Sequence, residues 1–220
     1  MMAHLRSKAT ETSDQRDISE EISTFVFLGL TGSAVLPLNP SILEISLLPI
    51  ERSDILLLAG QGLPRSLNRL TMTFKPHRSP IPIRVMQNTE LLDSSVEHSQ
   101  VICAEDVTII EKFIERLPGP VCLISYSANI YDYRVIKNEL NKLNRNISRH
   151  GLFCTSLRKA VCELRPELIS HELNDVYREL CNGEEPDSTE SAEGTVRMLT
   201  EIVSHLPGVI GWMDLHNELF

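Results

Sequence analysis

The segment Thr24 to Leu30 (TFVFLGL) is the sequence feature that most constrains the fold of this chain. It is an apolar run rich in side chains that favour β-structure, and Gly32 and Ser33 follow it. A continuous apolar strand is typical of the centre of a sheet that is covered on both faces. The run therefore predicts a buried central strand.

The rest of the chain supplies further strands and then helices. Ser41 to Ile50 predicts a second strand, which Ser53 to Ala59 is predicted to extend or follow. Leu67 to Phe74 alternates apolar and polar residues, as an edge strand does, and the prolines within Lys75 to Pro82 predict a loop. Later segments predict short strands at 121–126 and 152–156 and helices at 104–117, 131–143, 156–163, 171–180 and 192–205. This order predicts an α/β domain with a mixed sheet flanked by helices.

The pattern of polarity predicts one domain and a tail. Residues 1–22 are polar without an apolar period, which predicts a flexible N-terminal tail before a single domain at 23–220. We expect no signal peptide, because the N-terminal residues are polar and charged, and no apolar run reaches the ~20 residues of a membrane span. We expect a protein of the nucleus and/or cytoplasm that is neither secreted nor membrane-bound.

The cysteines and the charge distribution bear on metals and partners. None of the five cysteines forms a CxxC pair, so we expect buried thiols and no structural zinc. The net charge of -9 argues against a nucleic-acid coat. Residues 55–89 nevertheless carry five basic and no acidic residues, and residues 134–160 carry seven basic residues and one acidic. These stretches predict either a basic face or separate solvated surfaces.

Four segments resemble, in order and spacing, the motifs of three-prime repair exonucleases. Thr24 to Phe27 is similar to the start of the first motif, and Ser125 to Asp132 to the second, in which a strand precedes "YD". The stretch Asn174 to Val196 resembles the third motif, and Gly211 to Phe220 (GWMDLHNELF) resembles the family's C-terminal pattern. The resemblance covers residues 23–220 and implies a ribonuclease H-like mixed sheet flanked by helices, the DEDDh exonuclease fold.

The resemblance also implies a chemistry that this chain is poorly equipped to perform. The family removes nucleotides from DNA 3′ ends with two metal ions, which a ring of carboxylates must hold. Five positions of this sequence match its functional residues: Gly29, Thr31, Asp132, Glu190 and Thr195. Only Asp132 keeps the family's residue, because two aspartates, a glutamate and the histidine base are replaced. We therefore expect no catalytic residue, metal site or cofactor, and a carboxylate at Asp132 that favours the N-terminus of a helix.

Three functions follow from this combination. The first is a catalytically inactive pseudo-exonuclease that acts as a protein-interaction scaffold, and the family resemblance implies a homodimer joined at the edge strand. The candidate edge residues are Leu67, Arg69, Thr71 and Thr73. The second is a module that binds single-stranded DNA or RNA without cleaving it, with Arg65, Lys75, Arg134 and Lys159 as candidate contacts. The third is a residual Mg²⁺-dependent 3′–5′ exonuclease with an altered metal site.

Overall fold

The computed structural model describes residues 21–34, 39–58, 68–77, 80–89, 91–128, 131–147, 151–181 and 191–220. Its sheet has the strand order β3-β2-β1-β4-β5-β6. The strands are β1 (Thr24–Gly32), β2 (Ile42–Glu51), β3 (Leu70–Thr73), β4 (Val121–Ser125), β5 (Leu152–Ser156) and β6 (Glu218–Leu219). Strand β1 is antiparallel to β2 and parallel to β4, and β4 is parallel to β5. The mixed sheet that the sequence predicts is therefore confirmed.

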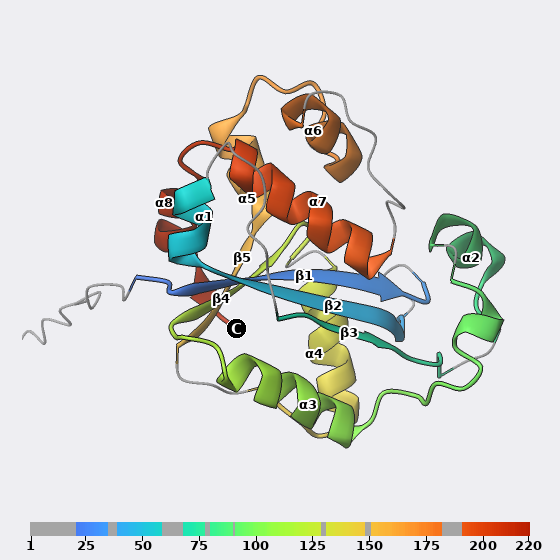
Figure 1. Cartoon of the computed structure of the whole chain (residues 1–220). Helices are drawn as coiled ribbons and strands as arrows, with labels where there is room; N and C mark the ends of the chain where they lie inside the picture. Colours follow the sequence, from blue (N-terminus) through green and yellow to red (C-terminus); the bar gives the residue numbers. More distant parts are fainter. Residues whose placement is uncertain are drawn as a thin grey trace, which may run out of the picture.

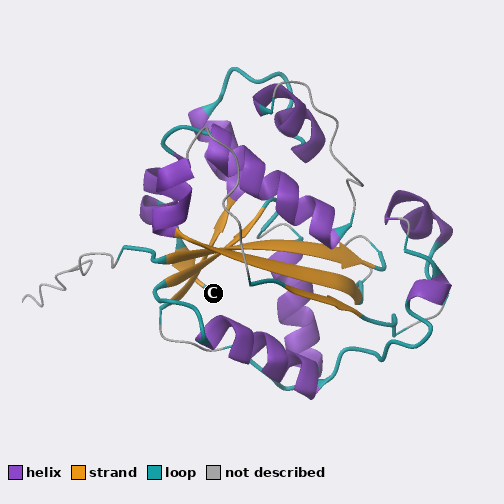
Figure 2. Cartoon of the chain, in the orientation of Figure 1, coloured by secondary structure: helices purple, strands orange, loops and turns teal. Residues whose placement is uncertain are grey.

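Helices cover both faces of this sheet (Figures 1 and 2). The helices are α1 (Arg52–Leu58), α2 (Ile83–Thr89), α3 (Ala104–Glu115), α4 (Asp132–Lys142), α5 (Leu157–Leu164), α6 (Leu173–Leu180), α7 (Ala192–His205) and α8 (Val209–Leu215). In Figure 1, α5, α6 and α7 lie above the sheet, and α3 and α4 lie below it. None of the helices in the described part of the chain is long and apolar enough to cross a membrane.

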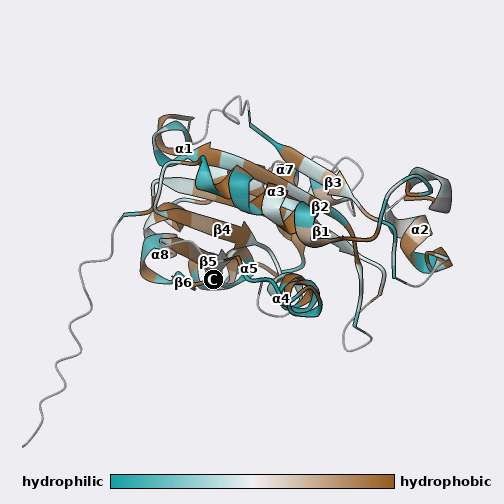
Figure 3. Ribbon diagram, turned by 90° about the horizontal axis from the view of Figure 1, so that it is seen from below, coloured by the Kyte–Doolittle hydropathy of each residue, from teal (hydrophilic) through white to brown (hydrophobic). Residues whose placement is uncertain are grey.

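The alternation of side chains along β1 builds two separate cores. Phe25 and Phe27 pack with α5, α7 and α8 on one face, while Val26 and Leu28 pack with α3 and α4 on the other. All four side chains are buried, which is why the run reads as continuously apolar. Strand β4, in the middle of the sheet, is likewise brown in the hydropathy colouring of Figure 3.

Several boundaries differ from the sequence predictions. The segment 53–59, predicted to extend or follow a strand, begins instead as helix α1, since leucine is a good helix former and only Ile55 needs burial there. Strand β3 begins at Leu70, and the predicted start at Leu67 lies outside the described residues. Helices α2 and α8 and strand β6 were not predicted.

Two further predictions concern the tail and the thiols. Residues 1–20 of the predicted tail lie outside the described residues, and Ile22, near its end, is buried in the core beside α7 and α8. Among the cysteines, Cys122, Cys154 and Cys181 are buried as predicted. Cys103 is half-buried and Cys162 is exposed, so burial was wrong for Cys162, which lies on the solvent side of α5.

Candidate functional site

The motif positions lie at the carboxyl ends of neighbouring strands because these strands run in the same direction. We call this end of the strands the carboxyl edge of the sheet. Strands β1, β3, β4 and β5 all point the same way, since β1 and β3 are both antiparallel to β2. Thr31 therefore lies at the same edge as Ser125, the last residue of β4, and helix α4 begins there at Asp132. The carboxyl edge of an α/β sheet is where ligands usually bind, so we call this group of positions the candidate cleft.

Gly29 is covered by the backbone of helix α7. A Cβ atom placed on Gly29 would overlap the carbonyl group of Ala192, whose carbon would be only 2.8 Å away. The atom that would clash is backbone rather than the flexible end of a side chain, so a rotamer change cannot relieve the overlap. This position, where the resembling family has its first metal-binding aspartate, is therefore closed to any side chain in this structure.

Glu44 anchors the same end of α7. Its Oε2 accepts a hydrogen bond of 2.8 Å from the N–H of Ala192, the first residue of the helix. Glu44 lies directly opposite Thr31 in the β1–β2 pairing, and Thr31 is buried. A carboxylate at a helix N-terminus also interacts favourably with the helix dipole. The Glu44 carboxylate is thus committed to holding α7 against the sheet.

Asp132 is the matched carboxylate of the second motif, and its polar partners lie at the end of β4. Ser125 donates a hydrogen bond from its Oγ to Oδ2 of Asp132, and the backbone N–H of Ser127 also bonds the carboxylate. Burial raises the pKa of the Asp132 carboxyl to about 6, against the lowering effect of both hydrogen bonds. The raised pKa means that the enclosed site stabilises the charged carboxylate less well than water does.

The third motif contributes the first turn of α7. Ser191 caps this helix by accepting a 2.9 Å hydrogen bond from the N–H of Gly194. Thr195, which replaces the last aspartate, is half-buried on the same helix, and Glu190 lies outside the described residues. Glu193 forms an ion pair with Arg69, which precedes β3, and lies 3.9 Å from Arg197. This turn therefore carries a carboxylate that is already paired.

These residues do not fit a pair of Mg²⁺ ions. Gly29, Thr31 and Thr195 supply no carboxylate, and the Asp132 carboxylate is largely enclosed and hydrogen-bonded to Ser125. Among the described residues, no three His, Cys, Asp or Glu side chains are grouped closely enough to hold a metal ion. Two hard cations need several oxygen ligands with negative charge, which this arrangement lacks.

Three of the four predicted basic contacts belong to the described residues. Lys75 follows β3, Arg134 is in the first turn of α4, and Lys159 is in the first turn of α5. All three are exposed, and each follows a strand that ends at the carboxyl edge. Arg65 lies outside the described residues.

Other basic residues of the stretch 134–160 are paired with acids: Lys142 with Glu139, Arg145 with Glu111 and Arg158 with Glu172.

Strand β3 lies at the end of the strand order, as the sequence predicts for an edge strand. Thr71 and Thr73 are exposed, and Thr71 Oγ1 is 3.0 Å from Ser46 Oγ on the neighbouring strand. Arg69 is held by Glu193 on α7. The outer side of β3 is thus a short strand edge flanked by an ion pair, and Leu67 lies outside the described residues.

Sequence reasoning missed two residues that shape this site. Ala192 closes the space over Gly29, and Ser125 donates to the Asp132 carboxylate. The sequence offers a signal for Ser125, because it is a polar residue at the end of an otherwise apolar strand. It offers none for Ala192, whose role comes from its backbone carbonyl.

Comparison with known proteins identifies relatives among exonucleases. No protein-family model matches the chain. Three-prime repair exonuclease 1 of Bos taurus is 27% identical over 219 residues, which span 90% of this chain and 69% of that protein. Three prime repair exonuclease 2 of Mus musculus is 27% identical over 208 residues, which span 87% of each. The resemblance that the motifs indicate is therefore confirmed by similarity over 87–90% of this chain.

Solved structures of Escherichia coli exonuclease I have the same fold. A zinc-bound complex with single-stranded DNA aligns with a TM-score of 0.68 at 15% identity, over 87% of this chain and 42% of that one. A complex with a dT13 oligonucleotide also aligns with a TM-score of 0.68, over 43% of its chain. The chain thus matches less than half of exonuclease I and has its ribonuclease H-like DEDDh exonuclease fold.

Proposed function

We propose that this chain, which has a DEDDh exonuclease fold similar to that of the three-prime repair exonucleases, is a pseudo-exonuclease that acts by binding. The observation that carries the proposal is the contact between Gly29 and the Ala192 carbonyl. A missing carboxylate alone could be replaced by a neighbouring one, but here helix backbone takes up the space beside Gly29. The candidate cleft therefore differs from a two-metal site in its shape as well as in its charge.

The remaining carboxylates support this proposal because each has another partner. Glu44 binds the N–H of Ala192, Asp132 is bonded by Ser125, and Glu193 pairs with Arg69. A cation would compete with these interactions, which position α7, α4 and the start of β3. Without two bridged cations, the chain lacks the means to activate water and to stabilise the leaving oxygen.

A degradation assay tests the absence of nuclease activity. The purified chain is incubated with a 5′-labelled single-stranded oligonucleotide in Mg²⁺ and, separately, in Mn²⁺ buffer. We expect no shortened product above that of a mock purification. Product that persists through repurification and disappears in Asp132→Ala would establish the alternative of a residual exonuclease with an altered metal site, and would overturn the proposal.

As a binding protein, the chain would use the edge of β3 to join a second copy or another protein. Its outer backbone groups lie at the end of the strand order, and an unpaired strand edge is a template for a further strand. Light scattering after gel filtration tests the dimer. Thr73→Lys should shift a dimer to monomer, whereas Ile109→Lys, at an exposed site on α3, should leave the mass unchanged. A monomeric wild type would contradict this part of the proposal.

A second candidate function is the binding of single-stranded nucleic acid without cleavage. Lys75, Arg134 and Lys159 are exposed, and each comes after the carboxyl end of a strand in the chain. The similar exonuclease I structures contain single-stranded DNA. A titration with labelled oligo-dT at several salt concentrations tests it, because each phosphate contact steepens the salt dependence. Arg134→Glu and Lys159→Glu should weaken binding and flatten the slope. Lys112→Glu, on α3, is the matched control, and equal effects of all three changes would reject this function.

A further inference from the structure

A second concave surface lies at the opposite edge of the sheet from the candidate cleft. It is a groove of about 580 Å³ between α1, which contributes Arg52, Ile55 and Leu56, and residues 203–211, which join α7 to α8. Helix α1 follows Glu51, and Glu51 pairs with Thr24 at the beginning of β1. In Figure 1, α1 and α8 lie together at the left side of the molecule, by the end of the sheet where β1 begins. We call this surface the α1–α8 groove.

The α1–α8 groove is mainly apolar and open to solvent, and its polar lining residues are Arg52, Ser204 and His205. Leu56 lines it and is 57% exposed, and the adjacent Leu57 is 75% exposed. Gly211 also lines it, and a Cβ atom added to Gly211 would meet no atom within 4 Å. Two neighbouring exposed leucines beside a hollow are unlike the scattered apolar residues of an ordinary surface. An open groove of this form suits a peptide segment of a partner protein better than a small molecule, which binds in a more enclosed pocket.

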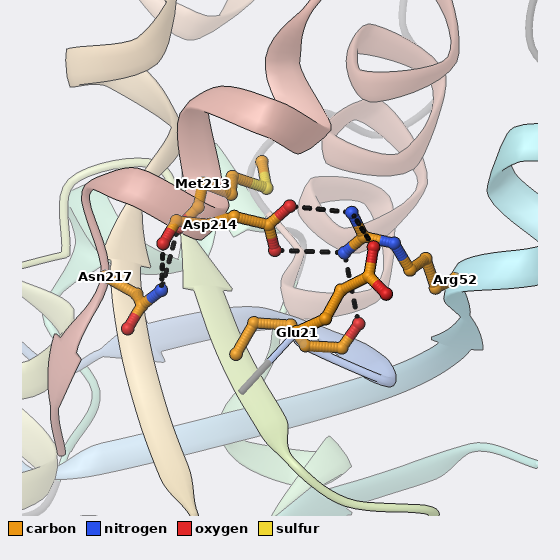
Figure 4. A network of polar contacts seen from close by, with 6 residues as sticks. Glu21, Arg52, Met213, Asp214 and Asn217 are labelled. Carbon is orange, nitrogen blue, oxygen red and sulfur yellow. Dashed lines mark hydrogen bonds and ion pairs between the residues drawn. The ribbon is translucent and has the colours of Figure 1, made fainter. Parts of the chain in front are cut away.

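Carboxylates bond Arg52 or neighbour the lining residues of α1 in the chain, although none of them lines the groove itself. Arg52 bonds both oxygens of Asp214, at 2.9 and 2.6 Å, and lies 2.9 Å from Glu21 (Figure 4). Its charge is therefore more than balanced. Glu51 and Asp54 are next to Arg52 and Ile55 in the chain, and both are exposed. The neighbourhood thus carries four carboxylates and one guanidinium, so its net charge is negative.

We propose that the α1–α8 groove binds a basic amphipathic helix of a partner protein. Apolar side chains along one face of such a helix would fill the space beside Leu56 and Gly211, which is how helices dock in hydrophobic grooves. Lysine or arginine side chains flanking that face would meet Glu51, Asp54 and the Arg52 network. Opposite charge at the rim would select this helix over an acidic one. Because the groove and the candidate cleft are at opposite edges of the sheet, this site does not depend on the proposed function of the cleft.

The probe is a pair of labelled amphipathic peptides of about 14 residues, roughly four helical turns. One consists of leucine and lysine, and the other has the same pattern with glutamate in place of lysine. Binding is followed by fluorescence anisotropy at ~0.15 M salt, where charges more than ~8 Å apart are largely screened. The variants are Leu56→Asp and Gly211→Phe, and Leu92→Asp is the matched control because Leu92 is 53% exposed and is not part of the groove lining.

The variant Leu56→Asp distinguishes binding of the basic peptide in the groove from its general attraction to an acidic protein. It adds a negative charge, so general attraction would make the basic peptide bind at least as well as before. Seating in the groove predicts a loss of roughly tenfold in affinity, as for removal of an apolar anchor. Gly211→Phe should cause a similar loss by filling the hollow, and Leu92→Asp should cause none.

Other outcomes would overturn the proposal. These are equal binding of the two peptides, undiminished binding to Leu56→Asp and Gly211→Phe, or no binding at all. A dimer of the chain that Leu56→Asp dissociates would assign the groove to a second copy instead. Circular dichroism of each variant checks the fold, which we expect to persist because both altered positions face open space.

Discussion

At Gly29 the chain lacks the metal-binding carboxylate of the resembling family, and it also lacks the space for any side chain at this position. The backbone of Ala192 lies where a side chain of residue 29 would begin. Gly29→Ala should therefore force α7 away from β1 and lower the free energy of unfolding by about 1–3 kcal/mol or more. Urea denaturation measures the change. Gly211→Ala is the control, because its added Cβ meets no atom and should stabilise helix α8 by about 0.5–1 kcal/mol.

Equal stability of Gly29→Ala and the wild type would show that α7 can move freely from this position. In that case Gly29→Asp would deserve a test for restored metal binding. We expect instead that Gly29→Asp is less stable than Gly29→Ala, since it brings a charge as well as extra atoms into the same contact.

The Asp132 carboxyl makes stability depend on pH. Its pKa is about 6 in the folded chain against 3.8 for an unperturbed aspartate, so the folded chain binds the proton more tightly. The stability that this group contributes is complete below pH ~4 and is lost as the pH rises through ~6. A difference this large corresponds to ~3 kcal/mol.

Asp132→Asn removes this loss because the amide stays neutral and can still accept the hydrogen bond from Ser125. We expect the variant to be more stable than the wild type above pH ~6 and to match it more closely near pH ~4. Unfolding curves at both pH values measure the difference. A variant that is destabilised equally at the two values would show that the negative charge itself is needed in the fold.

At the scale of elements, helix α7 depends on two acceptors at its first turn. Glu44 binds the N–H of Ala192, and Ser191 binds the N–H of Gly194. Glu44→Ala should cost about 1–3 kcal/mol because Ala192 is buried and its N–H would lose a charged acceptor. Ser191→Ala should cost about 1 kcal/mol, as for other helix caps.

Glu44→Gln is the discriminating control for this prediction, because it keeps an oxygen acceptor and removes the charge. Thermal or urea unfolding should rank its cost below that of Glu44→Ala. Equal costs for the two variants would mean that the charge of Glu44, and not the hydrogen bond to Ala192, holds the helix.

The sequence predicts elements well where the local pattern is strong. The apolar run from Thr24 predicts β1, because both faces of this strand are buried. The helical period of apolar residues predicts α3 equally clearly. Helix α1 was misjudged because ILLL fits a strand as readily as a helix, and only its position after β2 decides. Strand β6 has two residues, too few for any pattern, and exists because it pairs with β5.

The sequence indicates which residues form the candidate site, but it does not indicate the shape of that site. The order of the motifs locates Gly29, Thr31, Asp132 and Thr195, and the strand directions bring their elements to one edge. The closure over Gly29 depends on how far α7 descends onto the sheet, which is a property of packing between distant segments. No local sequence pattern predicts the distance between α7 and β1. A replaced carboxylate in a motif therefore does not show whether the space it would occupy is still present.

At the scale of the whole molecule, Arg52 ties together segments from both ends of the described chain. It bonds Asp214 on α8, the carbonyl of Ile22 at 3.2 Å and the side chain of Glu21 (Figure 4). The side chains of Arg52 and Asp214 are 18% and 21% exposed, so water screens their contact less than that of a surface pair. Two parallel hydrogen bonds also fix its geometry.

A double-mutant cycle measures this link between the ends of the chain. Arg52→Met, Asp214→Ala and the combined variant should show a coupling of about 1–3 kcal/mol in the free energy of unfolding. The exposed pair of Lys112 and Glu115, at 68% and 50% exposure, is the matched control and should couple by less than about 0.5 kcal/mol. Equal coupling in the two pairs would mean that Arg52 contributes only surface charge. In that case the packing of Ile22 and Trp212 in the core beside α7, rather than this ion pair, would hold the two ends together.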